Sequence, residues 1–170
     1  LGLVGSEMCI RDRNVAVVEL ADGYIQARAP SGLTGARVVF PMVSVGATEN
    51  ALIAATLAKG TSELVNVARE PEIMDLAECL NAMGARITGH GTDMITVEGV
   101  ESLGDAEQAV IPDRIEAGTF AIAALITGGD LTLTSARPRH LASRLEILKD
   151  TGAAIFVTDN SMRIAANGVA

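Results

Sequence analysis

The sequence predicts an α/β fold assembled from repeated βαβαββ units, because one pattern of strands and helices occurs in it twice. The first copy covers residues 38–99 and the second covers residues 109–168. Gly84-Ala85 in the first copy corresponds to Gly152-Ala153 in the second. An internal repeat restricts the fold more than any single motif does. The order of apolar runs within each copy then supplies the order of the elements.

The first copy opens with an apolar strand over residues 36–40, which ends at Pro41. Residues 44–58 are rich in alanine and apolar nearly all round, so they predict a buried helix. Lys59-Gly60 ends this helix, with a cation in the last turn and a glycine just beyond it. Residues 63–67 alternate in polarity and include the β-branched Val65 and Val67, which predicts a strand.

A second helix in the first copy begins at Pro71, a residue that the first helical position tolerates. Glu70 and Glu72 place negative charge at the positive end of its dipole. Apolar residues follow at helical spacing and predict a one-sided amphipathic helix. These residues are Ile73, Leu76, Ala77, Leu80 and Met83. Cys79 lies among them, and we expect it to be a buried apolar residue.

A hairpin of strands 86–89 and 94–98 completes the first copy. The second copy repeats the same order of elements, at residues 109–111, 115–126, 131–135, 141–150, 154–157 and 162–165. Upstream, residues 15–20 and 24–27 predict the closing hairpin of a third, truncated unit, with its turn at Asp22-Gly23. The sequence therefore predicts tandem units.

Composition excludes several classes of function. The net charge of −8, with no basic cluster, argues against a nucleic-acid partner but not against a small anionic ligand. No apolar run approaches the roughly 18 residues of a membrane span, so we expect no membrane partner. Cys9 and Cys79 give no disulfide framework, which favours a cytoplasmic location. His90 and His140 have no partner at metal-ligand spacing, so we expect no metal site.

Residues 1–13 do not fit the pattern that follows. They show no periodicity, and their apolar part is too short for a signal peptide. The string resembles a translated sequencing adaptor, so we interpret residues 1–13 as an artefactual tail outside the fold. We therefore expect the chain to be an internal fragment that lacks the true N-terminus.

Four separated blocks of sequence resemble the UDP-N-acetylglucosamine enolpyruvyl transferase family. They are SVGATEN at residues 44–50, AREPEIMD at 68–75, GTDMITVEGV at 91–100 and PDRIEAGTF at 112–120. The resemblance implies an inside-out α/β barrel of two domains, each made of three βαβαββ units, with the active site in the cleft between them. The present chain would hold an incomplete version of that fold.

The resemblance also implies a domain assignment. Residues 14–110 would be part of the N-terminal domain, comprising the end of one unit and one full unit. Residues 111–170 would be the first unit of the C-terminal domain, with the crossover near residues 100–112. Without the resemblance, one continuous domain of stacked units remains an alternative.

The reaction implied by the resemblance transfers the enolpyruvyl group of phosphoenolpyruvate to the 3-hydroxyl of UDP-N-acetylglucosamine and releases phosphate. This is the first committed step of peptidoglycan synthesis, and it supports cell wall formation, cell shape and cell division. The resemblance implies no cofactor.

The family takes its catalytic groups from an N-terminal lysine-asparagine pair, a loop cysteine or aspartate, and an aspartate and arginines further into the C-terminal domain. We expect none of these in the present chain. The loop residue would lie shortly upstream of Asn14, and Cys9 is not it. The fragment is therefore predicted to be inactive. Two alternatives stay open: the sister 3-phosphoshikimate enolpyruvyl transferase, and a non-catalytic binding or scaffold protein that reuses the repeat.

The strand-to-helix turn of the first copy is the main candidate for substrate binding. A helix start offers unpaired N–H groups to an anion, and Gly46 permits close approach of a ligand. The resemblance assigns contacts with UDP-N-acetylglucosamine to Met42, Val43, Ser44 and Val45. Many relatives carry a lysine where Met42 stands, so the contact with the diphosphate differs here. The alternative is that Ser44 is simply an N-cap, worth about 1 kcal/mol.

Four charged residues at helix starts are candidates for the cleft or for domain closure. The resemblance places Asp113, Arg114 and Glu116 beside the crossover, and Glu70 near the mobile loop of the family. The alternative for each is a charge that suits its own helix terminus or makes a local ion pair.

Overall fold

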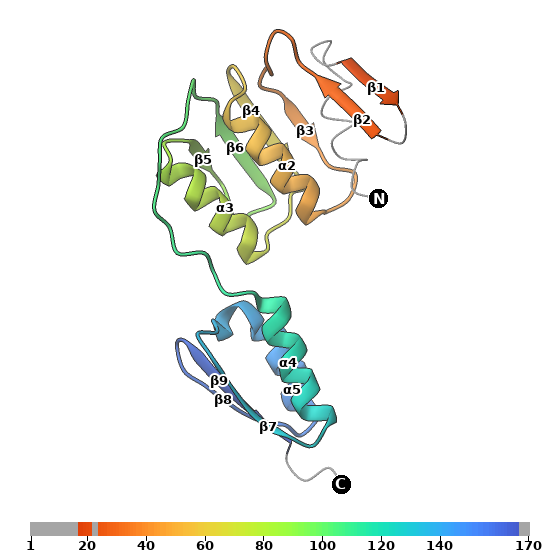
Figure 1. Cartoon of the computed structure of the whole chain (residues 1–170), viewed down its shortest axis with the longest axis vertical. Helices are drawn as coiled ribbons and strands as arrows, with labels where there is room; N and C mark the ends of the chain where they lie inside the picture. Colours follow the sequence, from red (N-terminus) through yellow and green to blue (C-terminus); the bar gives the residue numbers. More distant parts are fainter. Residues whose placement is uncertain (1–16, 22–23, 167–170) are drawn as a thin grey trace. The chain divides into compact units, whose positions relative to one another are not determined.

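The computed structural model describes residues 17–21 and 24–166, with side chains from residue 29 onwards (Figure 1). The chain divides into two compact units between Ala109 and Val110, and each unit is described by itself. That the two units belong to different domains of a longer protein stays a prediction.

The first unit has two helices over one face of a mixed sheet (Figure 1). Its elements are β3 (Arg37–Val39), α2 (Val45–Thr56), β4 (Thr61–Val65), α3 (Pro71–Ala82), β5 (Arg86–Thr88) and β6 (Met94–Glu98). The strand order is β3-β4-β6-β5; β3 and β4 are parallel and the other pairs are antiparallel. This is the predicted βαβαββ order.

Alternation along the strands separates the core of the first unit from its outer face. In β4 and β6 the inward residues Leu64 and Ile95 are at most 1% exposed, and they pack with Leu52 and Ile73 of the helices. The outer face carries cross-strand ion pairs, such as Arg37 with Glu63 at 3.4 Å and Arg86 with Glu98 at 3.7 Å. These pairs are exposed, so burial of the apolar face stabilises the unit far more.

The second unit repeats this design with one strand fewer. Its elements are α4 (Arg114–Ile126), β7 (Asp130–Thr134), the 3₁₀ helix η1 (Pro138–Leu141), α5 (Ala142–Asp150), β8 (Ala154–Val157) and β9 (Ser161–Ala165). The antiparallel sheet has the order β7-β9-β8. Ala121 of α4 and Leu145 of α5 pack on Met162 and Ile164 of β9.

The predicted upstream hairpin is confirmed as β1 (Val17–Ala21) and β2 (Tyr24–Arg28), which pair antiparallel. Its turn at Asp22-Gly23 and the predicted tail at 1–13 lie outside the described residues. Among the described residues, no helix is long and apolar enough to cross a membrane.

The predicted strand at 109–111 is wrong, because these residues have no regular structure and Val110 is 80% exposed. The matching strand β3 is held by more than its ladder: the Asn66 side chain donates to the Phe40 carbonyl oxygen at 2.9 Å. Ser135 follows β7 at the position where Asn66 follows β4, and its shorter side chain makes no such bond in the described chain. Residues 109–111 precede Pro112, which has no N–H to donate, so they would make too few hydrogen bonds to form an edge strand without such a bond.

The prediction of a buried helix over residues 44–58 is wrong for one side of α2, and α4 also has an exposed side. Ile53 of α2 is 51% exposed, and Phe120 and Ile126 of α4 are 51% and 79% exposed. Each helix lies against its own sheet, and these exposed residues lie on the side that faces away from that sheet. The partly buried Cys79 differs from its prediction for a similar reason, because it lies at the border of the packed face of α3.

Most predicted boundaries in the described chain differ by one or two residues, and two of the differences have a clear local cause. The strand predicted at 63–67 ends at Val65, because Asn66 adopts a left-handed backbone conformation with φ of 62°. The helix predicted at 141–150 is preceded by the 3₁₀ turn η1, which begins at Pro138.

Candidate functional site

The parallel pairing of β3 with β4 brings two predicted site segments to one edge of the first sheet. Val39 pairs with Val65, so the chain leaves both strands at the same edge. We call residues 40–46 the β3–α2 turn and residues 66–70 the β4–α3 loop. Ligands of open α/β sheets bind beyond the carboxyl ends of the strands. The candidates of the β3–α2 turn and Glu70 therefore share an edge at which binding is common.

The inner side of the β3–α2 turn is anchored by backbone and side-chain hydrogen bonds. Phe40 is 3% exposed, and its N–H donates to the Val65 carbonyl oxygen at 3.0 Å. Its own carbonyl oxygen accepts from the Asn66 side chain. The Asn66 N–H in turn donates to the Asp93 carbonyl oxygen at 2.8 Å. Asn66 thus ties the turn to the β5–β6 hairpin, and asparagine tolerates the left-handed conformation that this needs.

Ser44 is the N-cap of α2, which is the structural role that we gave above as the alternative to substrate binding. It has extended φ and ψ of −147° and 123°, and its Oγ accepts from the Ala47 N–H at 3.4 Å. The Thr48 N–H donates to the Ser44 carbonyl oxygen at 3.0 Å. The N–H groups of Val45 and Gly46 are left without an acceptor among the described residues. The cap therefore satisfies part of the helix start and leaves two donors for an anion.

The outer side of the β3–α2 turn is open. Met42 and Val43 are 71% and 55% exposed, and Gly46 is exposed as well. A Cβ atom added to Gly46 would meet no atom within 4 Å. Packing within the described chain therefore does not require glycine at this position, whereas close approach of a ligand would.

Thr48 is a residue of this edge that sequence reasoning missed. It is 0% exposed, and its Oγ1 donates to the Ser44 carbonyl oxygen at 2.8 Å. The same Oγ1 accepts from the Ala68 N–H at 3.0 Å. Its signal in the sequence is a hydroxyl residue four positions after Ser44, within an alanine-rich segment.

Glu70 is half-buried at the start of α3, where its side chain makes no capping bond. Its Oε2 instead accepts from the Arg69 N–H at 2.9 Å. The carboxylate thus lies at the positive end of α3, on the same edge as the β3–α2 turn.

In the second unit, Asp113 is the N-cap of α4. Its Oδ1 accepts from the N–H groups of Ile115 at 2.7 Å and Glu116 at 3.1 Å. The Asp113 carboxylate therefore occupies the donors that an external anion would use. Arg114 is the first residue of α4, and Glu116 is exposed on its first turn. That these residues face a cleft stays a prediction.

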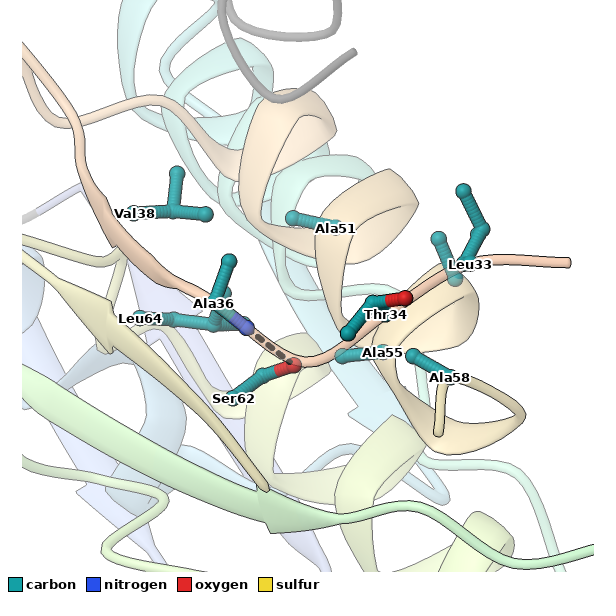
Figure 2. Close-up of a pocket in the computed structure, with 10 residues that line it drawn as sticks. Leu33, Thr34, Ala36, Val38, Ala51, Ala55, Ala58, Ser62 and Leu64 are labelled. Carbon is teal, nitrogen blue, oxygen red and sulfur yellow. Dashed lines mark hydrogen bonds between the residues drawn. The ribbon is translucent and has the colours of Figure 1, made fainter. Parts of the chain in front are cut away.

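Two apolar hollows lie in the described chain, one in each unit. The hollow of the first unit lies between β3 and α2, has a volume of about 90 Å³ and is lined mostly by alanine and leucine (Figure 2). Its polar members are Thr34 and Ser62, and the Ser62 Oγ accepts from the Ala36 N–H at 3.4 Å. A second hollow of about 260 Å³ lies between α4 and α5. Neither offers the cluster of charges that a phosphorylated substrate needs.

Asp130 and Arg163 form an ion pair in the second sheet, and each shifts the pKa of the other. Arg163 Nε donates to Asp130 Oδ1 at 2.9 Å, and this bond lowers the pKa of Asp130 and raises that of Arg163. The guanidinium also lies 5.9 Å from the centre of the Phe156 ring. The pair joins β7 to β9 on the exposed face, so its role is structural. Within residues 29–166, no three His, Cys, Asp or Glu side chains gather in a way that could hold a metal.

Comparison with known proteins places this geometry in a family. The family model for EPSP synthase (3-phosphoshikimate 1-carboxyvinyltransferase) matches residues 12–169. The chain belongs to the EPSP synthase family. Within this family it is 56% identical over 153 residues to a UDP-N-acetylglucosamine 1-carboxyvinyltransferase from Xanthobacter autotrophicus. It is 54% identical to the enzyme of the same name from Nitrobacter hamburgensis. The predicted resemblance is thereby confirmed.

The matches to these relatives cover 90% of this chain and 36% of each relative, so the chain spans about a third of their length. Among solved structures, the enolpyruvyl transferase NikO from Streptomyces tendae has a TM-score of 0.80 at 23% identity. The match covers 90% of this chain and 40% of NikO. An EPSP synthase from Acinetobacter baumannii has a TM-score of 0.61 at 21% identity, covering 89% of this chain and 36% of its own. These likenesses confirm the predicted fold class, in incomplete form.

Proposed function

We propose that this chain is part of an enzyme that transfers the enolpyruvyl group of phosphoenolpyruvate to the 3-hydroxyl of UDP-N-acetylglucosamine. In that reaction the hydroxyl oxygen bonds to C2 of phosphoenolpyruvate, and the bond from C2 to the phosphate oxygen breaks. Inorganic phosphate leaves, and in the net reaction it carries the proton released from the hydroxyl. The observation that carries the proposal is the sequence identity to relatives named UDP-N-acetylglucosamine 1-carboxyvinyltransferase, which is 52–56% over 90% of the chain.

Within that enzyme, the β3–α2 turn is proposed to bind the nucleotide sugar. The turn is open on its outer side, and the N–H groups of Val45 and Gly46 are free to meet a phosphate oxygen. Ser44 adds a hydroxyl, while Met42 and Val43 offer apolar contact to a base or sugar ring. Met42 brings no positive charge, so the diphosphate would depend on backbone donors at this point.

Glu70, Asp113, Arg114 and Glu116 are proposed to line the cleft or to assist its closure. The position of Glu70 beside the β3–α2 turn supports this assignment for Glu70. For Asp113 the capping bonds favour a mainly structural contribution. We expect the 170-residue chain to be inactive by itself, since the catalytic groups of the family lie in stretches that it lacks. For the intact enzyme we propose a cytoplasmic location and a role in peptidoglycan synthesis.

The test is an assay of the full-length protein encoded by the source gene. With phosphoenolpyruvate and UDP-N-acetylglucosamine, we expect release of phosphate and formation of the enolpyruvyl nucleotide sugar. Shikimate 3-phosphate should give no product, and the 170-residue chain should be inactive with both acceptors. Product from shikimate 3-phosphate alone would favour the sister enzyme. No product from either acceptor would favour a binding protein built on the same fold.

A further inference from the structure

The buried hydroxyl of Thr48 joins the two segments that meet at the carboxyl edge of the first sheet. It donates to the Ser44 carbonyl oxygen at 2.8 Å, within the β3–α2 turn. It accepts from the Ala68 N–H at 3.0 Å, within the β4–α3 loop. Ala68 is 0% exposed, so no water replaces this bond while the unit stays folded.

Another threonine of the same helix shows that this link is not a general property of buried threonines. Thr56 is also 0% exposed, and its Oγ1 donates to the Leu52 carbonyl oxygen at 2.9 Å, one helical turn back. In the described chain this is the whole hydrogen bonding of the Thr56 hydroxyl. Thr48 makes the same bond within its helix and adds a bond to another segment.

The second unit lacks the link altogether. Thr48 lies four residues after the cap Ser44, and Ala117 lies four residues after the cap Asp113. Alanine has no group that could bridge α4 to the segment after β7. The bridge therefore belongs to the unit whose helix start keeps donors open, and it is not needed to build the repeat.

We propose that Thr48 is a positioning residue for nucleotide-sugar binding. Its hydroxyl holds the Ser44 carbonyl, and hence the β3–α2 turn, against the β4–α3 loop, so that the open N–H groups of Val45 and Gly46 are fixed before the ligand arrives. Thr48 acts through Ser44 and does not itself touch the ligand. This inference rests on the proposed function, because it concerns the same site. Preorganisation of this kind improves affinity by lowering the cost of ordering on binding.

The test compares three variants of the full-length enzyme. Thr48→Val keeps the shape and removes the hydroxyl, so KM for UDP-N-acetylglucosamine should rise about fivefold to tenfold, the worth of roughly one hydrogen bond. The kcat and the KM for phosphoenolpyruvate should stay within about twofold of wild type, because Thr48 does not act on the reacting atoms. Thr48→Ser restores the hydroxyl and should restore the KM. Thr56→Val is the matched control and should leave this KM unchanged.

Amide hydrogen exchange gives a second measurement that does not depend on turnover. Exchange at Ala68 should quicken in Thr48→Val and stay slow in Thr48→Ser and Thr56→Val. Equal KM values for Thr48→Val and Thr56→Val, in an active enzyme, would overturn the role of Thr48 and leave the proposed function standing. A wild-type enzyme that makes no product from UDP-N-acetylglucosamine would overturn both.

Discussion

Two helix starts occupy the same place in the repeat and complete their backbone hydrogen bonds in different ways. At α2, Ser44 makes one long bond to the Ala47 N–H. At α4, Asp113 makes two shorter bonds, to Ile115 and Glu116. The first start stays open to an anion, and the second is closed by its own carboxylate. The difference shows that one apolar framework can leave backbone donors open at one helix start and cap them with a side chain at the other.

The two units also differ in the hydrogen bonds that hold the segment before the helix in place. In the first unit, Asn66 and Thr48 tie the β3–α2 turn to neighbouring segments. In the second unit, Ser135 and Ala117 stand at the matching positions, and no strand forms before α4. The polar residues at strand ends, more than the apolar pattern, distinguish the two copies.

The largest expected effect comes from the core, where the copies also differ. Leu52 is 0% exposed and lies eight residues after its cap, where α4 carries Ala121. Leu52→Ala should lower the free energy of unfolding of the first unit by about 2–5 kcal/mol, because it leaves a cavity. Hydrogen exchange of the β4 and β6 amides in the 170-residue chain measures this. The control Ile53→Ala, on the exposed side, should cost far less, and equal costs would contradict the packing described.

A smaller change in stability is expected at the position where each copy has a residue in the left-handed backbone conformation. Asn66 has φ of 62° and Ser135 has φ of 56°. Asn66→Ala should cost about 1–2 kcal/mol, because it loses the bond to Phe40 and strains the backbone. Asn66→Gly keeps the backbone conformation accessible and should cost less.

Ser135→Gly is the matched change in the second unit and should be neutral or stabilise by up to about 1 kcal/mol. Chemical denaturation of each variant, followed by exchange in its own unit, checks both. If Ser135→Gly proves as costly as Asn66→Ala, the two positions do not differ as described.

Caps should give the next effect in size. Asp113→Ala should destabilise α4 by about 1 kcal/mol, and Ser44→Ala should cost about half as much, since its single bond is long. Amide exchange in the first turn of each helix is the measurement. The reverse order of costs would contradict the contrast drawn between the two helix starts.

The smallest effect concerns Asp130 and Arg163, a pair on the exposed sheet of the second unit. Arg163 lowers the pKa of Asp130 by a direct hydrogen bond. The pair therefore stabilises the unit above the ordinary aspartate pKa of about 4, and this contribution is lost as the pH falls through the lower pKa of the folded state. An NMR titration should find the pKa of Asp130 returning towards its ordinary value in Arg163→Met, and unaltered in Lys149→Met.

The sequence alone predicted most of the framework, because it depends on apolar periodicity and on glycine and proline at the ends of elements. Pro71 opens α3 and Gly84 follows it with φ of 103°, as both residue types indicate. The absent strand at 109–111 was not predictable in this way, since its formation depends on a bond from a residue more than twenty positions away. The exposed sides of α2 and α4 were not predicted either, because apolar periodicity does not show how many elements pack against a helix.

The site was predicted unevenly for the same reason. The motif at 44–50 pointed to the β3–α2 turn, and the helix start with its open donors is where the sequence placed it. Thr48 and Asn66 were missed, because their roles lie in contacts across the sheet edge. Whether the predicted residues bind substrate stays a prediction.

Hydrogen exchange of the full-length enzyme with and without UDP-N-acetylglucosamine tests the central claim most directly. The nucleotide sugar should slow exchange across residues 43–47, with the largest change at Val45 and Gly46, whose N–H groups are open in the structure. Saturating ligand that supports product formation but leaves exchange at residues 43–47 unaltered would contradict the claim, because the nucleotide sugar would then bind elsewhere.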